Sequence, residues 1–330
     1  MKGITLPISK SIANRILLLQ AIHGDPLMRV SAFGGTANNM QWGESDVPDD
    51  IIVLHNALER LREHKQGEPL VLNLKNCGTA LRFLQVHIDK FYPGEPITLT
   101  GDPRLLERLG KPTTQTASAR ILHGDQVPVL PDESPYITMS RRMAAMYQPG
   151  VVEDIERCWS SAAFWYEYMA LQPLLYPDGP RELLLQGLAA DSLQGDRMVA
   201  DIYAEHFGVK TTFTYDGAII VNNTTRQSIV DCQLPDRQLV LDFTNCPDLY
   251  PAIALTCERL GIPLIATGTE RLAYKESNRL EAVASHQVRH DHRMAMALLV
   301  AGYPVDDTAC IAKSYPSFLS QWLDVTKARC

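Results

Sequence analysis

Residues 7 to 20, PISKSIANRILLLQ, place a lysine, two serines and an arginine at the start of an aliphatic helix pattern. A helix needs one capping residue, so capping explains Ser9 or Ser11 but not Lys10 and Arg15. The first turn of a helix presents unpaired N–H groups, to which Lys10, Ser11 and Arg15 would add donors for phosphate or carboxylate. The stretch therefore indicates an anion site. A capped helix with solvated charges is the alternative.

A polar cluster followed by an apolar helix pattern recurs along the chain. The further examples are NCGTALRFLQV (76–86), CWSSAAFWYEYMAL (158–171), DSLQGDRMVADIYAEHFGV (191–209), KESNRLEAVA (275–284) and DHRMAMALLVAGY (291–303). Several are flanked by short aliphatic or β-branched runs, PLVLNL, ITLTG, AIIVN and LIATG, which predict strands. Repeated strand–turn–helix–strand units can direct several helix N-termini at one anion site. For any single pair, chance likeness between amphipathic helices is the alternative.

The composition limits the class of protein. A chain of 330 residues with 45% hydrophobic and 21% charged residues is long enough for two folded domains. A formal charge of −7 without a long Lys/Arg run argues against a nucleic-acid partner. Seven scattered cysteines without a C-x-x-C pair indicate a reducing compartment and no structural metal. Because the sequence has no 18-residue apolar stretch and no signal-like start, we expect a cytoplasmic protein without a membrane partner.

Eight segments, taken in order, resemble the motifs of the 5-enolpyruvylshikimate-3-phosphate synthase (3-phosphoshikimate 1-carboxyvinyltransferase) family. They are PISKSIANR, NCGTALRFL, TGDPRLLER, DSLQGD, TNCPDLYPAIA, RLAYKESNR, DHRMAM and AKSYPSF. The resemblance covers nearly the whole chain, and eight ordered matches are far more specific than any one of them. The first motif favours this family over the sister family that acts on a UDP-amino sugar, which usually begins with Lys-Asn.

The resemblance implies an enzyme that transfers the enolpyruvyl (1-carboxyvinyl) group of phosphoenolpyruvate to the 5-hydroxyl of shikimate 3-phosphate. Phosphate is released, in a step of chorismate and aromatic amino-acid biosynthesis. The resemblance implies no metal, no organic cofactor and a monomer, with glyphosate accepted in the phosphoenolpyruvate site. Two alternatives stay open, namely enolpyruvyl transfer to another acceptor such as a UDP-amino sugar, and a catalytically impaired anion-binding homologue.

The implied fold is α/β, with two domains of βαβαββ repeats in an inverse α/β barrel-like arrangement and an active site between the domains. In the family pattern the chain starts in one domain, crosses to the other and returns. Applied to this chain, residues 9–155 form the first domain, and residues 1–8 and 156–330 form the second. The two crossovers, near 8–9 and 155–156, are expected to act as a hinge.

The resemblance also implies site residues, by motif position. Phosphoenolpyruvate is assigned to Lys10, Gly78, Arg108, Arg279, Arg293 and Lys313. Shikimate 3-phosphate is assigned to Lys10, Ser11, Arg15, Tyr136, Asp248 and Lys275. These residue types fit the task, because both substrates are polyanions and arginine offers a planar fork to carboxylate and phosphate oxygens.

Three of these residues are assigned to catalysis. Glu276 is expected to be the acid and base at the methylene carbon of phosphoenolpyruvate, and Asp248 the base toward the 5-hydroxyl, with Lys10 assisting. Motif membership gives no chemical role to three other residues: Arg82 and Arg104 are expected in surface salt bridges, and His292 in the core.

The chain is shorter than the family pattern at two internal places. Only 28 positions separate Arg108 from Tyr136, and the Ser-Ser-Gln motif that binds the substrate phosphate in the family has no counterpart there. After KESNRLEAVA, the residues SHQVR replace a helix end, a strand pair and a loop. Cys158, Asn278 and Glu133 stand where an acidic residue, Asp and Ser are usual. We therefore expect a divergent or internally shortened member.

Overall fold

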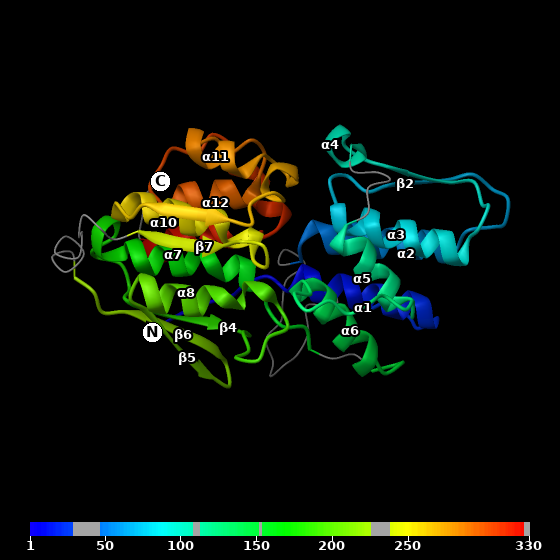
Figure 1. The fold of residues 1–330 in the computed structure, drawn as a ribbon, viewed down its shortest axis with the longest axis horizontal. Coiled ribbons are helices and arrows are strands. Elements are labelled where there is room, and N and C mark those ends of the chain that lie inside the picture. The colour runs from blue at the N-terminus through cyan, green and yellow to red at the C-terminus, as the bar shows by residue number, and fades with distance from the viewer. Residues whose placement is uncertain (29–46, 108–112, 152–153, 226–237, 327–330) are drawn as a thin grey trace. The chain divides into compact units, whose positions relative to one another are not determined.

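A computed structural model of the chain describes residues 1–28, 47–107, 113–151, 154–225 and 238–326 (Figure 1). The chain divides into two compact units, each with its own hydrophobic core. We call Ile8–Ile155 the inserted unit, and Met1–Pro7 together with Glu156–Cys330 the terminal unit. The chain therefore begins in the terminal unit, passes through the inserted unit and returns. The hinge role expected for the two crossovers stays a prediction.

The inserted unit is mainly helical. Its elements are α1 (Lys10–His23), α2 (Asp49–Arg62), β2 (Leu70–Asn73), α3 (Gly78–Phe91), β3 (Ile97–Thr100), α4 (Pro103–Leu106), α5 (Thr114–Leu122) and α6 (Pro135–Met146). Strands β2 and β3 pair in parallel. Helices α1, α2 and α3 pack together through fully buried aliphatic side chains such as Leu18, Leu54 and Leu84. Helix α1 starts after the N-cap Ser9 and ends at Gly24, whose φ of 73° suits a glycine C-cap.

The terminal unit combines strands and helices. Its elements are β1 (Lys2–Ile4), α7 (Trp159–Leu175), β4 (Glu182–Gln186), η3 (Gly195–Met198), α8 (Val199–His206), β5 (Val209–Thr214), β6 (Gly217–Asn222), β7 (Leu239–Asp242), η4 (Pro247–Leu249), α10 (Tyr250–Leu260), β8 (Leu264–Thr267), η5 (Leu272–Tyr274), α11 (Arg279–Ser285), α12 (His292–Val300), η6 (Ala309–Lys313) and α13 (Phe318–Thr326). A mixed sheet has the order β1-β4-β6-β5, and β7 and β8 form a separate parallel pair.

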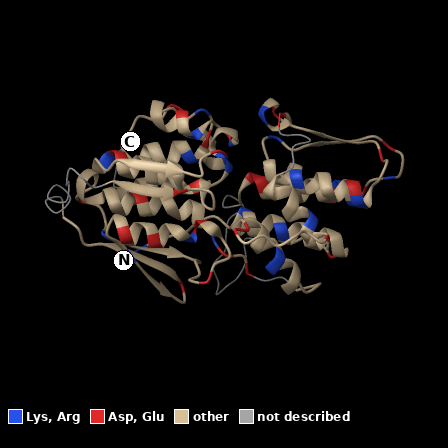
Figure 2. Ribbon diagram, in the orientation of Figure 1, with Lys and Arg blue, Asp and Glu red and all other residues tan. Residues whose placement is uncertain are grey.

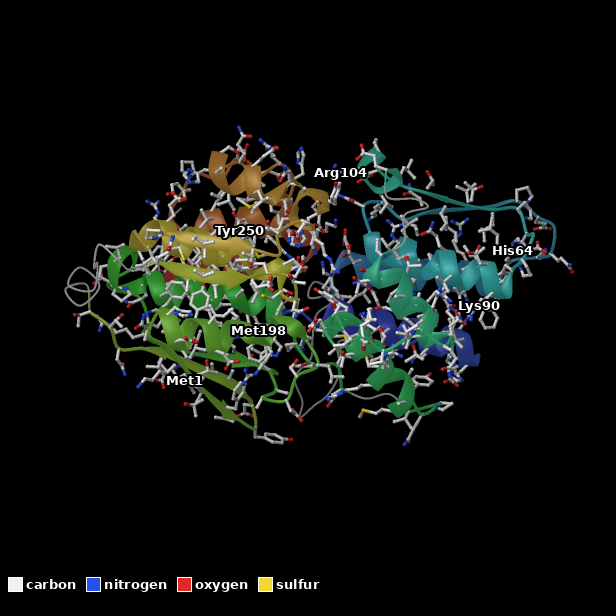
Figure 3. The ribbon with its side chains drawn as sticks, viewed as in Figure 1. Met1, His64, Lys90, Arg104, Met198 and Tyr250 are labelled. Atoms are coloured by element: carbon white, nitrogen blue, oxygen red, sulfur yellow. The ribbon has the colours of Figure 1, made fainter. Side chains whose placement is uncertain are left out.

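Helix α7 forms the centre of the terminal unit (Figure 1). It is buried from Trp159 to Pro173 and packs against β6, α8, α10 and α12. Most of its residues are hydrophobic, and such a helix is stable only when other elements cover it. Figure 3 shows side chains throughout the terminal unit around it. Its N-terminus is thereby fixed, and the first turn of α7 contributes to the site described below.

The secondary structure agrees with the sequence predictions at most of the repeated units. All four predicted strand segments contain strands, and the α/β class is confirmed. Between α11 and α12, residues 286–291 form a short connection without a strand. His286, Arg289 and His290 in this connection have φ values of 51°, 51° and 56°. Left-handed backbone is unfavourable for residues other than glycine, so the shortened connection is strained.

The charged residues carry both signs in both units (Figure 2). Acidic and basic positions are interspersed along the ribbon of the described residues, without an extended stretch of one sign. Among the helices described, none is long and apolar enough to cross a membrane. Among the described residues, the densest concentration of paired charges lies at the helix beginnings of the terminal unit.

Candidate active site

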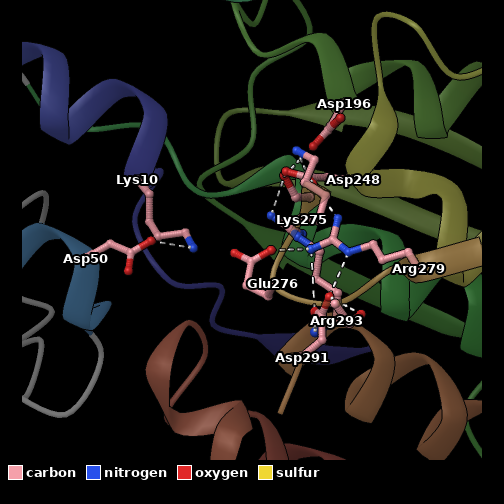
Figure 4. A network of polar contacts seen from close by, with 11 residues as sticks. Lys10, Asp50, Asp196, Asp248, Lys275, Glu276, Arg279, Asp291 and Arg293 are labelled. Atoms are coloured by element: carbon pink, nitrogen blue, oxygen red, sulfur yellow. Dashed lines mark hydrogen bonds and ion pairs between the residues drawn. The ribbon is translucent and has the colours of Figure 1, made fainter. Parts of the chain in front are cut away.

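The terminal unit gathers charged side chains at the beginnings of its helices (Figure 4). Asp248 lies in η4 directly before α10, and Arg279 is the first residue of α11. Asp291 caps α12 by accepting a hydrogen bond from the backbone N–H of Arg293 at 3.0 Å. Helix beginnings carry unpaired N–H groups and the positive end of the dipole, so carboxylates and other anions are stabilised there.

Arg279 is the centre of this network, and its side chain is fully buried. Its Nη1 donates to Asp248 Oδ1 at 2.6 Å, and its Nη2 donates to Glu276 Oε2 at 3.0 Å. Its Nε donates to Asp291 Oδ2 at 2.9 Å. Burial would lower the pKa of Arg279, but the three carboxylates outweigh burial and raise it. One guanidinium therefore fixes both carboxylates that the sequence analysis assigned to proton transfer.

Asp248 also contacts two further cations. Lys275 Nζ lies 3.2 Å from Asp248 Oδ1, and Arg293 Nη2 donates to Asp248 Oδ2 at 3.0 Å. Burial would raise the pKa of Asp248, but Arg293, Lys275 and Arg279 outweigh it and hold this pKa well below its ordinary value. Asp248 is therefore a weak base in this arrangement. An anion that drew Arg293 or Lys275 away from it would make Asp248 more basic.

Asp196, in η3, is a buried carboxylate of this network that the sequence analysis did not assign. It accepts a hydrogen bond from the hydroxyl of Ser160, in the first turn of α7. Its Oδ1 is buried without a hydrogen-bond partner among the described residues. Burial and the negative charge of Asp248 raise the pKa of Asp196 to about 6, against the opposing effect of nearby cations. Asp196 can therefore exchange a proton close to neutral pH.

In the inserted unit, the beginnings of three helices meet around Asp50, the second residue of α2. Lys10 is the first residue of α1, and its Nζ lies 3.1 Å from Asp50 Oδ2. Cys77 directly precedes Gly78, the first residue of α3, and its Sγ lies 2.9 Å from Asp50 Oδ1. Two residues predicted to bind phosphoenolpyruvate, Lys10 and Gly78, thus belong to one junction. A third, Arg108, lies outside the described residues.

Arg15, predicted to bind shikimate 3-phosphate, is fully buried in the inserted unit. Its donors reach the carbonyls of Ser11 at 2.7 Å and Tyr136 at 2.9 Å, and the hydroxyls of Ser140 at 2.8 Å and Ser118 at 3.3 Å. All these acceptors are neutral, and no carboxylate of the described chain contacts Arg15. Burial lowers the pKa of Arg15 to about 10. Ser11, Arg15 and Tyr136 are brought together, but Arg15 would have to become exposed to contact a ligand.

The remaining predicted residues lie as follows. Lys313 ends η6 and is half-buried. Arg104 forms a surface pair with Glu107 at 3.2 Å, a role that the sequence analysis had allowed. The expectation of a surface position for Arg82 is wrong, because the side chain is buried in α3, where it donates to Gln85 at 3.3 Å. His292 is buried at the start of α12, as expected. In the part of the chain that the structure describes, no group of three or more His, Cys, Asp or Glu residues could hold a metal ion.

Sequence reasoning missed three carboxylates that contact predicted site residues or lie close to them. Asp196 and Asp291 stand inside the segments DSLQGD and DHRMAM, so a search of these segments for acids able to pair with the predicted cations would have found them. Asp50 stands in DVPDD, which carries no motif. Only the packing of α2 against α1 brings Asp50 to Lys10.

No protein-family model matches the chain. Proteins named 3-phosphoshikimate 1-carboxyvinyltransferase do match it, among them those of Bacteroides fragilis (strain YCH46) and Methanosphaerula palustris, each 26% identical. The matches cover 98% of this chain and 94% of the first protein, and 95% of this chain and 94% of the second. A solved EPSP synthase from Acinetobacter baumannii has the same fold, with a TM-score of 0.54 at 14% identity over 98% of this chain and 95% of that one.

The alignment with the Bacteroides fragilis protein also measures internal shortening. It runs over 411 positions, whereas 98% of the 330 residues is about 323. About 88 aligned positions at least therefore have no residue in this chain. The missing strands between α11 and α12 agree with such a loss.

Proposed function

We propose that the chain transfers the enolpyruvyl group of phosphoenolpyruvate to the 5-hydroxyl of shikimate 3-phosphate, because it is a divergent member of the 3-phosphoshikimate 1-carboxyvinyltransferase family. The observation that carries this proposal is the attachment of Asp248 and Glu276 to one buried guanidinium, that of Arg279. The reaction needs one group to serve the hydroxyl and one to serve a carbon atom. Two carboxylates held in a fixed relation meet that need.

In this proposal Glu276 exchanges protons with carbon, and Asp248 takes the proton of the 5-hydroxyl. Glu276 delivers a proton to the methylene carbon of phosphoenolpyruvate while the 5-hydroxyl attacks the neighbouring carbon and gives its proton to Asp248. The carbon–oxygen bond to phosphate then breaks, and phosphate leaves with the electron pair and can take the proton from Asp248. Glu276 removes a proton from the new methyl group, which forms the enol ether. Lys10 assists at the departing phosphate.

The cations hold the substrates. The phosphate and carboxylate of phosphoenolpyruvate would be bound by four cations, Arg293, Lys313, Arg108 and Lys10, and by the backbone of Gly78. Arg279 already donates to the carboxylates of Asp248, Glu276 and Asp291. Its part in binding phosphoenolpyruvate would therefore be to hold these carboxylates in place. Shikimate 3-phosphate would be bound by Lys275 and Asp248 in the terminal unit and by Ser11, Arg15 and Tyr136 in the inserted unit. The proposal therefore requires the two units to close on the substrates.

Two further parts of the proposal follow from the sequence and the resemblance. We place the protein in the cytoplasm as a monomer, and no step above needs a metal or an organic cofactor.

Calorimetry and a turnover assay test the proposal. Shikimate 3-phosphate should bind, and addition of phosphoenolpyruvate should then release inorganic phosphate and form the enolpyruvyl product. No binding of shikimate 3-phosphate would contradict the proposal, and a UDP-amino sugar would then be the next acceptor to test. Binding of both substrates without phosphate release would identify an anion-binding homologue that has lost the reaction.

A further inference from the structure

The Lys10–Asp50 pair has an unusual position for a salt bridge. Both side chains are only 15% exposed, and the pair lies where α1, α2 and α3 begin. Asp50 also has the thiol of Cys77 at 2.9 Å and the positive end of the α2 dipole to stabilise its charge. A protein anion therefore stands against the lysine that the proposed function assigns to an anionic substrate.

We propose that Asp50 is a positioning residue, which holds Lys10 at the helix junction and competes with phosphoenolpyruvate for its ammonium group. This inference rests on the proposed function, because it needs Lys10 to meet that substrate. The lysine side chain is flexible, and a partner on a helix restricts where its ammonium group can lie. The partner's negative charge also opposes an incoming phosphate at the same group.

The two effects predict opposite changes in binding and turnover. Asp50→Asn keeps the size of the side chain and an oxygen acceptor but removes the charge. Phosphoenolpyruvate should then bind roughly threefold to tenfold more tightly, measured by calorimetry with shikimate 3-phosphate present. The kcat should fall, because Lys10 is less well held. A purely structural role would predict weaker binding together with slower turnover.

Asp49→Asn is the matched control. Asp49 is the preceding residue of α2, its side chain is 45% exposed, and its partner is Lys75 at 3.5 Å rather than Lys10. The two variants therefore carry the same net charge. Asp49→Asn should leave the affinity for phosphoenolpyruvate within about twofold of the unaltered protein. Equal tightening in both variants would show a general charge effect and overturn the inference.

A double-mutant cycle with Lys10→Met shows whether Asp50 acts through Lys10. In the Lys10→Met background, Asp50→Asn should leave the affinity for phosphoenolpyruvate unchanged. A second measurement needs no variant at Asp50. The NMR signal of the Lys10 ammonium should shift when phosphoenolpyruvate is added, because the ligand replaces the Asp50 carboxylate as its partner. Loss of the signal in Lys10→Met assigns it.

The outcomes separate this inference from the proposed function. If the unaltered protein binds phosphoenolpyruvate and turns it over, but Asp50→Asn binds it equally or more weakly, the positioning role is wrong and the proposed function stands. An unchanged Lys10 signal at saturating phosphoenolpyruvate overturns the inference in the same way. If the unaltered protein does not bind phosphoenolpyruvate, the proposed function fails and this inference with it.

Discussion

Arg279 donates to Asp248 across 2.6 Å from a side chain that is fully buried, whereas Asp248 keeps 14% of its side chain exposed. The arginine therefore lies behind the carboxylate, as its support. Removing one member of a buried ion pair leaves the other charge unpaired, which costs far more than the pair contributes. The relationship predicts that Arg279 matters first for holding Asp248 and Glu276 and only then for any substrate contact.

Arg279→Lys should lower both stability and turnover. A lysine ammonium cannot match the planar fork that reaches Asp248, Glu276 and Asp291 at once. We expect a loss of about 2–4 kcal/mol in the free energy of unfolding, measured by urea denaturation, and a fall of roughly 10² in kcat. Arg289→Lys is the control, because Arg289 pairs with Glu281 on the surface at 2.9 Å. Equal effects of the two substitutions would contradict the supporting role.

Glu276→Gln should separate chemistry from binding. The amide keeps the shape of the side chain and an acceptor for Arg279 but cannot exchange a proton with carbon. We expect kcat to fall by roughly 10² or more, while the affinity for shikimate 3-phosphate stays within a few-fold. Glu281→Gln, at an exposed position of α11, which begins three residues after Glu276, should leave kcat unchanged. A parallel loss of affinity and rate would instead make Glu276 a binding residue.

Glyphosate should inhibit in competition with phosphoenolpyruvate. The resemblance implies that the phosphoenolpyruvate site accepts this anionic mimic, so under the proposed function it would be bound by the same cations. Steady-state kinetics at varied phosphoenolpyruvate should show an increase in KM with an unchanged kcat, and Arg293→Ala should weaken inhibition. Competition with shikimate 3-phosphate would show that the cations were assigned to the wrong substrate.

The sequence predicted where the helices of the site begin better than it predicted which side chains contact one another there. Polar clusters before apolar patterns located the starts of α1, α3 and α11, because capping and amphipathic spacing are local properties. The contact of Asp50 with Lys10 depends on how α2 packs, and the burial of Arg15 depends on Ser118 and Ser140, which lie far away in the chain. No local pattern carries such information, because these partners meet only through tertiary packing.

Asp196→Asn should weaken the pH dependence of anion binding. The pKa of Asp196 is raised to about 6, so the unaltered protein gains a negative charge in the site as pH rises through that value. Affinity for phosphoenolpyruvate should therefore decrease from pH 5 to pH 7 more steeply than in the variant. The phosphate of the ligand also titrates near pH 6 in both proteins. The quantity to follow is therefore the ratio of the dissociation constant of Asp196→Asn to that of the unaltered protein.

The control for that experiment is Asp191→Asn, an exposed aspartate at the start of the same segment. It should leave the pH profile of the dissociation constant unchanged. If the ratio between Asp196→Asn and the unaltered protein stays constant from pH 5 to pH 8, Asp196 does not titrate in the site.

Glu167 gives a prediction about stability rather than function. It is fully buried in helix α7, and neither carboxyl oxygen has a hydrogen-bond partner among the described residues. Burial raises the pKa of Glu167 well above its ordinary value, so the folded protein holds this group as a neutral acid. The unfolded chain releases the proton at the ordinary pKa. The contribution of Glu167 to stability is therefore fully present below the unfolded pKa and is lost as pH rises through the folded pKa.

Replacing Glu167 by glutamine removes this proton and with it the pH dependence. The free energy of unfolding of the unaltered protein, relative to Glu167→Gln, should fall by up to about 1.4 kcal/mol for each pH unit above roughly 4.3. Urea denaturation between pH 5 and pH 8 measures the difference, and Glu270→Gln, at an exposed position, should show no such trend. Parallel stability curves for Glu167→Gln and the unaltered protein would mean that Glu167 is charged in the folded state. A buried and unpartnered carboxylate would then have to be stabilised by groups other than those described, because burial alone opposes its charge.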